Sequence, residues 1–289
     1  MLCVLPTILS IVLLGVLPAL LNVVLSFTDF DGNYAGFKFV FLDNYINFFT
    51  ILGTDVSKAF GTTFRYMALM ILPLQVIALG AALLVNSQKI KGKGFFRAIF
   101  FLPSILGIAV VCTIWQMMYD PIDGLFAMIY EALHKVMPFF PESSAFLGNP
   151  KLSLVYISVA ALWASFGYSM AIYLAGLAGI GKDYYEAASI EGAGRWALLK
   201  HITLPLLWPA VIINLWIALQ GTIGMSEYII FFTNGAYNTS TIGFYIYNMV
   251  MKRTASQGQA AAVSIYFFFF TTTVMLLFNK FVRKREVSV

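Results

Sequence analysis

The chain has 289 residues, of which 60% are hydrophobic and only 11% are charged, and its mean hydropathy is +0.84. Soluble domains carry about 25% charged residues, so this composition excludes an ordinary water-soluble globule and predicts a membrane protein with several spans. Cys3, Cys112, His134 and His201 are scattered, and their spacing indicates neither a disulfide framework nor a metal site.

Six stretches, taken in chain order, are apolar over the roughly 20 residues that a membrane-spanning helix needs. They cover residues 4–27, 60–85, 95–119, 152–180, 206–232 and 260–282. Prolines lie in or near four of them, at Pro18, Pro73, Pro103 and Pro209, where a membrane bundle tolerates kinks. The segment DNYINFF, residues 43–49, is expected to form a short interfacial helix. The predicted fold class is an all-α polytopic membrane protein with six transmembrane helices and one domain, residues 1–289.

The basic residues predict the orientation of this bundle. Eleven of the 18 lysines and arginines fall on the side that holds both termini and the connection 182–205, and seven fall on the other side with most of the acids. Cytoplasmic loops carry the excess of basic residues, so both termini are expected in the cytoplasm. Because topology accounts for the net charge of +5, no nucleic-acid partner is expected. The first residues lack a basic region before the apolar run, which disfavours a cleaved signal peptide.

The connection 182–205 reads KDYYEAASIEGAGRWALLKHITLP and differs from its apolar surroundings. Asp183 and Glu186 have the spacing of a capping box at a helix start. Gly192 and Gly194 permit a turn, after which a second short helix is expected over residues 195–201. Pro205 is expected in the first turn of the fifth span. This pattern predicts a compact helix–turn–helix elbow able to enter a socket on a partner. An ordinary solvated loop, with alanine and glycine for tight turning, explains the same composition equally well.

The spacing within this connection resembles the EAA signature of ABC importer permeases. The signature reads EAA, three residues, G, nine residues, I, one residue, LP, and this chain matches all of its fixed positions, Glu186, Ala187, Ala188, Gly192, Ile202, Leu204 and Pro205. The flanking sequence and the stretch FFRAIFFLPSILGIAVVCTIWQMMYDP, residues 95–121, resemble the carbohydrate-uptake branch that includes the maltose permease. TNGA, residues 233–236, departs from the TGGP or TNGGP of relatives in an outside loop.

The resemblance implies a type I ABC importer permease fold in the cytoplasmic (inner) membrane of a bacterium or archaeon, surrounded by membrane lipid. It implies a second permease subunit, two ABC ATPase subunits, an extracytoplasmic solute-binding protein and a sugar substrate. The elbow would be the coupling helix, and Glu186 would meet a basic residue of the ATPase. ATP and Mg would bind to the ATPase, since this chain has no Walker A pattern, and no cofactor or metal is expected on the chain itself.

Two helix faces are candidates for the substrate pathway. Each has residues at i, i+3, i+4 and i+7, namely Ala161, Ala164, Ser165 and Tyr168 in the fourth span and Ala218, Gly221, Thr222 and Met225 in the fifth. Small residues leave space there, although the pattern alone favours close helix packing. By the resemblance, these faces match those that line the maltose site, where Tyr168 is identical and the other positions differ. Asn214 and Gln220 lie inside the fifth span and must face protein, water or substrate.

Three other functions stay open at this point. An ion-coupled secondary carrier usually needs ionisable groups deep in the membrane, whereas Glu227 is the only acid in the spans and lies near an outer end. An integral membrane enzyme would need a catalytic arrangement, and the two isolated histidines do not provide one. An importer for glycerol phosphate, peptide or another solute would keep the same architecture and change only the cargo.

Overall fold

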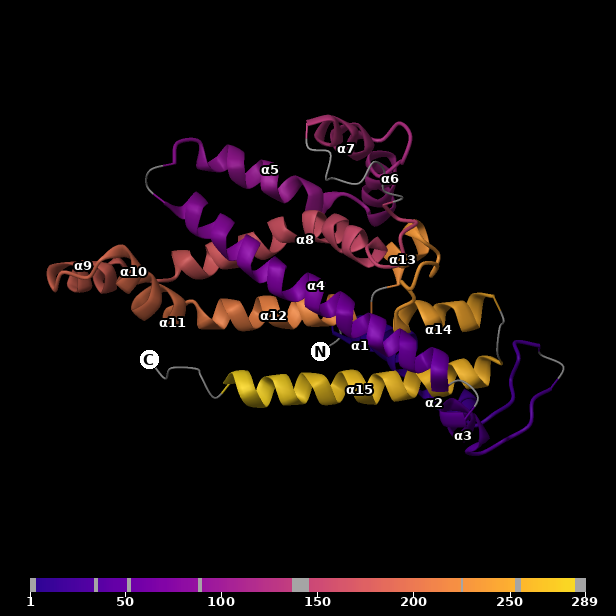
Figure 1. Ribbon diagram of the computed structural model, residues 1–289. Helices are drawn as coiled ribbons and strands as arrows, with labels where there is room; N and C mark the ends of the chain where they lie inside the picture. The colour runs from indigo at the N-terminus through magenta and orange to yellow at the C-terminus, as the bar shows by residue number, and fades with distance from the viewer. Residues whose placement is uncertain are drawn as a thin grey trace.

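The computed structural model describes residues 4–33, 36–50, 53–87, 90–136, 146–224, 226–252 and 256–283. Within these residues the regular structure is helical, apart from one isolated bridge between Thr28 and Phe39. The long helices lie side by side in an elongated bundle (Figure 1). We call the end that carries residues 182–206 the elbow end and the end that carries α3, α13 and α14 the loop end.

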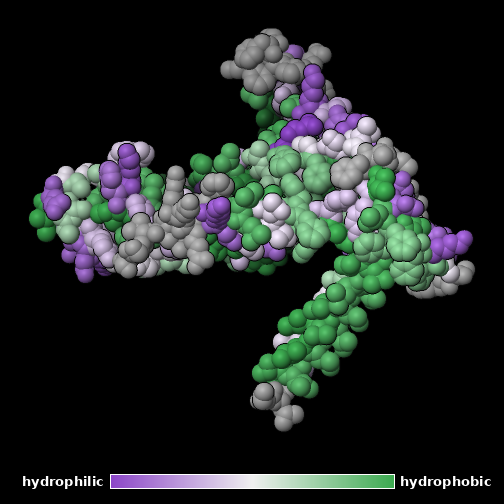
Figure 2. Space-filling model, turned by 90° about the horizontal axis from the view of Figure 1, so that it is seen from below, coloured by the Kyte–Doolittle hydropathy of each residue, from purple (hydrophilic) through white to green (hydrophobic). Residues whose placement is uncertain are grey.

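The first apolar stretch forms one helix of 21 residues, which contacts the bundle near its C-terminal end, where it packs against residues 257–283. It consists of α1 (Leu5–Ile11), the π-helical segment η1 (Val12–Val16) and α2 (Leu17–Leu25). No part of its most apolar window is buried, and its mean hydropathy is 2.7. It projects from the body as a hydrophobic rod (Figure 2). The predicted first helix is therefore present, and its surface is free to meet lipid or another protein.

The centre of the bundle is built from α4 (Gly53–Asn86), α8 (Ser153–Ala178) and α12 (Trp208–Ile223), with α15 (Gln257–Arg283) alongside. Small residues set how closely these helices approach. A Cβ added to Gly176 of α8 would lie 2.7 Å from the Cβ of Ala210 on α12, and one added to Gly167 would overlap the carbonyl oxygen of Phe100. Close approach through glycine and alanine is the usual packing of membrane helices. The second, fourth and sixth predicted spans are thus confirmed as helices, with shifted ends.

The third predicted span, residues 95–119, is wrong as a single helix. The chain forms α5 (Lys93–Ile105) and α6 (Ile108–Met118), and the two are bent by 99° at the break. Pro103 lies in the last turn of α5, and Leu106 and Gly107 are extended, with ψ of 137° and 145°. Proline removes a backbone donor and clashes with the preceding turn, so the helix ends soon after it.

The fifth predicted span, residues 206–232, is also corrected. Residues 195–206 form a helix made of α10 (Arg195–Leu198), η2 (Leu199–Thr203) and α11 (Leu204–Leu206), and the chain then bends by 64° into α12. Pro209, and not Pro205, occupies the first turn of α12. That helix ends at Ile223, and α13 (Glu227–Phe232) is separate. Within the described residues, four helices alone are long and apolar enough to span a membrane, and the count reaches the predicted six when each bent pair is one span.

Both π-helical segments precede a proline by the same distance. η1 ends at Val16 and Pro18 follows two residues later, just as η2 ends at Thr203 before Pro205. In each segment a backbone N–H bonds five residues back, from Leu17 to Val12 and from Leu204 to Leu199. A widened turn before proline relieves the clash between its ring and the preceding carbonyl.

Four short helices pack at the loop end. α3 (Asp43–Thr50) confirms the helix predicted at residues 43–49, whereas α7 (Leu125–Val136) and α14 (Ile242–Met251) were not predicted because they are shorter than a span. The fourth is α13. The turn before α7 is held by Asp120, whose carboxylate accepts from the backbone N–H of Ile122 at 2.8 Å and of Asp123 at 3.0 Å. These two donors lower the pKa of Asp120 below its ordinary value.

Candidate functional site

The elbow is formed by α9 (Lys182–Ile190) and by the helix of residues 195–206. The predicted capping box is wrong, because Gly181 is the N-cap and no side chain caps the helix, so Asp183 lies inside the first turn. The predicted turn is present: Gly192 has a φ of +83°, and the N–H of Ala193 bonds to the carbonyl of Ala188 at 2.9 Å. Glycine adopts this left-handed conformation at little cost, which ends α9 compactly.

The second helix of the elbow is longer than the predicted residues 195–201. The π-helical segment η2 carries the helix past His201 to Leu206, so Ile202, Leu204 and Pro205 belong to the elbow and not to α12. The hydroxyls of Tyr185 and Thr203 lie 3.2 Å apart and join the two helices. The elbow is therefore one unit connected to α12 through the bend at Leu207, which is fully buried.

The outer surface of the elbow combines charge with two exposed apolar side chains. Glu186 and Ala187 are exposed and Ala188 is half-buried. Ile190 is 87% exposed and Trp196 is 74% exposed, although both are large and apolar. Sequence reasoning missed these two residues, and their signal was a large apolar side chain on either side of the turn at Gly192 and Gly194. Exposed apolar residues rimmed by polar ones mark a protein interaction site.

A cavity of about 300 Å³ lies where α4, the α5–α6 break, α8, α12 and α13 meet. Six residues of the two predicted faces line it, namely Ala164, Ser165, Tyr168, Ala218, Gly221 and Thr222. Two faces that are far apart in the sequence thus come together around one space. Their role in carrying a substrate stays a prediction.

Three of the other predicted pathway residues, Ala161, Asn214 and Gln220, do not line this cavity. Ala161 is fully buried in the packed core. Asn214 is 1% exposed and donates from Nδ2 to the carbonyl of Ser169 at 3.0 Å, so it joins α12 to α8. Gln220 is exposed on another face of α12. Met225 lies outside the described residues.

Sequence reasoning missed several residues that complete the cavity. Ser104, Leu106 and Ile108 come from the break between α5 and α6, and Tyr228 comes from α13. The sequence did not predict this position. A straight third span would have spaced Ser104, Leu106 and Ile108 along one helix, whereas the break places them beside the cavity. The signal in the sequence was the group Pro103, Ser104 and Gly107, which favours a break but does not say where it points.

The cavity lining is uncharged and mainly apolar, with hydroxyl groups placed among the apolar side chains. Hydroxyls come from Ser104, Ser165, Tyr168, Ser169, Thr222 and Tyr228, and the described lining contains no Asp, Glu, Lys, Arg or His. Ser104 and Thr222 already donate to helix carbonyls, at 2.6 Å to Phe101 and 2.8 Å to Ala218. Tyr168 is 48% exposed, so it presents the largest accessible polar side chain to the space. Such a lining suits a neutral solute rich in hydroxyl groups.

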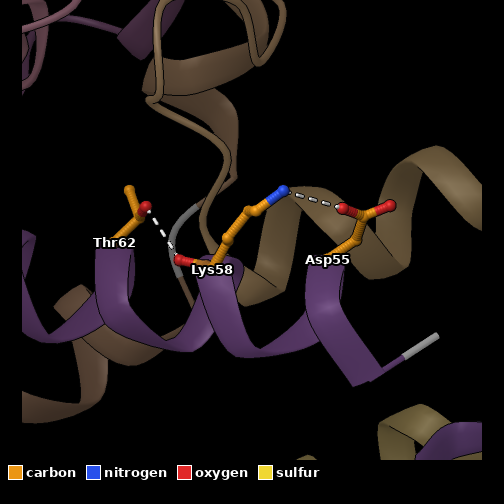
Figure 3. Close-up of polar contacts among 3 residues, drawn as sticks. All are labelled: Asp55, Lys58 and Thr62. Carbon is orange, nitrogen blue, oxygen red and sulfur yellow. Dashed lines mark hydrogen bonds and ion pairs between the residues drawn. The ribbon is translucent and has the colours of Figure 1, made fainter. Parts of the chain in front are cut away.

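A second, charged cavity of about 400 Å³ lies at the loop end. Asp55, Lys58, Thr62 and Arg65 line it from α4, and residues 235–245 close it from the other side. Lys58 Nζ lies 3.5 Å from Asp55 Oδ1, and Thr62 Oγ1 donates to the carbonyl of Lys58 at 3.0 Å (Figure 3). The ion pair is exposed, and such pairs add little stability, so these charges remain available for a partner.

The charged cavity is rigid on its loop side. The backbone N–H of Ile242 donates to the buried Thr63 Oγ1 at 2.9 Å, which fixes the loop to α4. Thr233 and Thr239 share a hydroxyl hydrogen bond of 2.6 Å. Tyr237 and Asn238 have φ of 55° and 59°, a backbone conformation that residues other than glycine rarely adopt. Among the described residues, no group of three or more His, Cys, Asp or Glu could hold a metal ion here or elsewhere.

Residues 76–287 match the family model of the binding-protein-dependent transport system inner membrane component. The chain belongs to this family. The matched segment contains both helix faces of the central cavity and the whole elbow, and it leaves out the first helix. The elbow and all of the cavity lining except Met70 and Leu74 are therefore in the region that this permease shares with its family.

Individual relatives agree with the family. A probable ABC transporter permease of Pyrococcus horikoshii is 30% identical over 224 residues, which cover 76% of this chain and 73% of the relative. The multiple sugar-binding transport system permease MsmF of Streptococcus mutans is 30% identical over 266 residues, covering 91% and 87%. A bacterial ABC transporter that imports the acidic polysaccharide alginate superposes with a TM-score of 0.80 at 23% identity, over 98% of this chain and 94% of the other. This last likeness establishes the permease fold.

Proposed function

We propose that this permease is a subunit of an ATP-driven, binding-protein-dependent importer of sugars or oligosaccharides and forms half of its translocation pathway. The observation that carries the proposal is the uncharged, hydroxyl-lined cavity between α8, α12 and the α5–α6 break. Relatives support the cargo, since they include a lactose permease of Rhizobium radiobacter and a trehalose/maltose permease of Thermococcus litoralis.

The elbow is the proposed contact with the ATPase. Glu186 offers a carboxylate for a basic residue, and Ile190 and Trp196 offer apolar surface for a socket. Because the Tyr185–Thr203 contact and the bend at Leu207 join the elbow to α12, movement of the elbow would move one wall of the cavity. ATP and Mg would bind on two separate ATPase subunits, and hydrolysis would drive the change between inward-facing and outward-facing states.

The orientation follows from this assignment. The elbow end would face the cytoplasm of a bacterium or archaeon, together with both termini, and the protein would lie in the inner membrane. The loop end would then face outward and receive the solute-binding protein, as supported by the alginate importer whose structure includes a periplasmic protein. The charged cavity at Asp55, Lys58 and Arg65 is a suitable contact for that protein.

A second permease subunit would complete the pathway. The cavity of about 300 Å³ is small for an oligosaccharide, so a second chain must supply the remaining wall. The first helix buries no part of its apolar window against its own chain, so it is free to pack against that subunit.

Two of the alternatives are disfavoured by the cavity lining. A phosphate-bearing solute would need a cation to replace its lost hydration, and the described lining offers none. An ion-coupled carrier would need an ionisable carboxylate or base at the same depth, which the described lining also lacks. A neutral peptide would still fit the space and is distinguished only by transport.

The test is ATP-driven uptake by the assembled transporter. The tagged chain is purified from native membranes with its retained subunits, which mass spectrometry identifies, and is reconstituted in vesicles. Glu186→Ala and Gly192→Val are expected to lower ATP-driven sugar uptake by about tenfold or more while the chain still inserts. Valine at Gly192 must adopt a φ of +83°, although no atom lies within 4 Å of the added Cβ.

Gly194→Ala is the matched control. Gly194 has ordinary extended dihedrals, with φ of −72° and ψ of 167°, and nothing lies within 4 Å of an added Cβ, so uptake should be unchanged. Normal uptake by both test variants would refute the coupling role of the elbow. Uptake driven by a proton gradient without ATP would refute the importer itself.

A further inference from the structure

An apolar groove of about 400 Å³ lies between α5 and α8 on the flank of the bundle. Arg97, Ala98 and Phe101 line it from α5, and Met170, Ala171 and Leu174 line it from α8. It is separate from the central cavity, with which it shares no residue. One cation and five apolar side chains therefore enclose this space.

The close approach of the two helices explains why the groove begins where it does. Gly167 packs directly against the backbone of Phe100 and Phe101, and the rings of Phe100 and Phe166 lie 5.5 Å apart. One turn nearer the elbow end, the lining residues include Ala98 and Ala171, which are too small to fill the gap between the helices. The groove is therefore fixed by helix packing and not by a mobile loop.

Arg97 lies at the elbow end of this groove and has no bound partner. It is exposed, and among the described residues its guanidinium makes no hydrogen bond or ion pair. Arg97 is four residues inside α5, and Leu174 is four residues from the end of α8, which places both about 6 Å within the helices. Met170 lies about 12 Å within α8 by the same rise per residue. Arg97 and Leu174 thus lie equally far from the helix ends, and the groove extends about 6 Å deeper to Met170.

We propose that this groove binds one anionic phospholipid, with its phosphate on Arg97 and an acyl chain between α5 and α8. A guanidinium forms charge-assisted, bidentate hydrogen bonds with phosphate oxygens. Basic pockets between membrane helices on the cytoplasmic side bind anionic headgroups in this way. The charge of Arg97 and the apolar walls select a ligand that has an anion at one end and hydrocarbon at the other.

Lipid retention by the assembled transporter tests this directly and needs no ATP. The complex is exchanged into nanodiscs of phosphatidylcholine with a minority of phosphatidylglycerol. After the complex is released from the nanodiscs, native mass spectrometry counts the phosphatidylglycerol that stays bound to it. Arg97→Gln is expected to weaken retention about fivefold, the effect of one basic residue at an anionic surface. Ala171→Phe is expected to lower retention as well, because it fills the groove without changing any charge.

Lys280→Gln is the matched control, since Lys280 is an exposed cation near the C-terminal end of α15 and lies outside the groove. An equal loss of lipid in Arg97→Gln and Lys280→Gln would overturn the proposal in favour of general surface charge. Cross-linking of an Ala171→Cys variant to the second permease, with no phosphatidylglycerol retained by the wild type, would overturn the proposal and show that another subunit covers the groove. Retention that needs both Arg97 and an open groove supports the lipid site, whether or not the transporter carries a sugar.

Discussion

The first helix and α8 are both apolar, but they occupy opposite environments. The first helix has a mean hydropathy of 2.7 with none of its most apolar window buried, whereas α8 has 1.5 with 44% of that window buried. The more hydrophobic helix is thus the less buried one, the reverse of the rule for soluble proteins. In a membrane the lipid is itself apolar, so large aliphatic residues face outward and small or polar residues mark contacts between helices.

Residues of the same type have different surroundings in the two parts of the molecule. Gly167 of α8 lies against the backbone of Phe100, while nothing lies within 4 Å of a Cβ added to Gly15 in the first helix. Asn214, on the helix that packs against α8, is buried and hydrogen-bonded, whereas the Asn22 side chain of the first helix is half-buried and makes no hydrogen bond within the described residues. Matched substitutions at these positions therefore test whether the two helices differ in their surroundings.

The largest expected effect is that of Gly167→Ala. The added methyl group would overlap the Phe100 carbonyl oxygen, so α5 and α8 must separate, which is expected to cost about 1–3 kcal/mol. Gly15→Ala is the control and should change stability by less than about 0.5 kcal/mol. Thermal unfolding of the two variants in the same detergent measures the difference. Equal stability of the two would mean that α8 is not the packed helix described above.

A moderate effect is expected from Asn214→Leu. The substitution removes the hydrogen bond from Nδ2 to the Ser169 carbonyl and is expected to cost about 0.6–1.7 kcal/mol, the range for hydrogen bonds between membrane helices. Asn22→Leu should be neutral or slightly stabilising, because leucine suits the exposed, apolar first helix. Steric trapping of each variant in bicelles would compare them, and a larger loss for Asn22→Leu would reverse the assignment of the two environments.

The smallest expected effect on stability is that of Tyr168→Phe. Tyr168 is exposed on α8 and lines the cavity, so loss of its hydroxyl should change the free energy of unfolding by less than about 0.5 kcal/mol. Uptake should nevertheless change, in rate or in apparent affinity for the sugar. Unchanged uptake together with altered assembly would make Tyr168 a packing residue and leave the cavity without its main polar contact.

Particular residues show how far the sequence could predict the candidate site. The faces at Ser165 and Thr222 followed from helical spacing, and the structure places both beside one cavity. Asn214 and Gln220 were indistinguishable as amides within one span, yet one is buried against α8 and the other is exposed. Helix periodicity says which residues share a face, but only the neighbouring helix decides which face is covered.

Composition and local spacing are enough to predict a membrane protein with six apolar stretches and an elbow, because each residue of a span must suit its lipid or protein surroundings. The folded bundle is needed to show that the third and fifth stretches bend, by 99° and 64°, and that Ser104 and Tyr228 reach the central cavity. Proline permits a break at many positions along a helix. The direction of that break depends on how closely Gly167 and Gly176 let the neighbouring helices approach, and that distance is a property of the packed bundle.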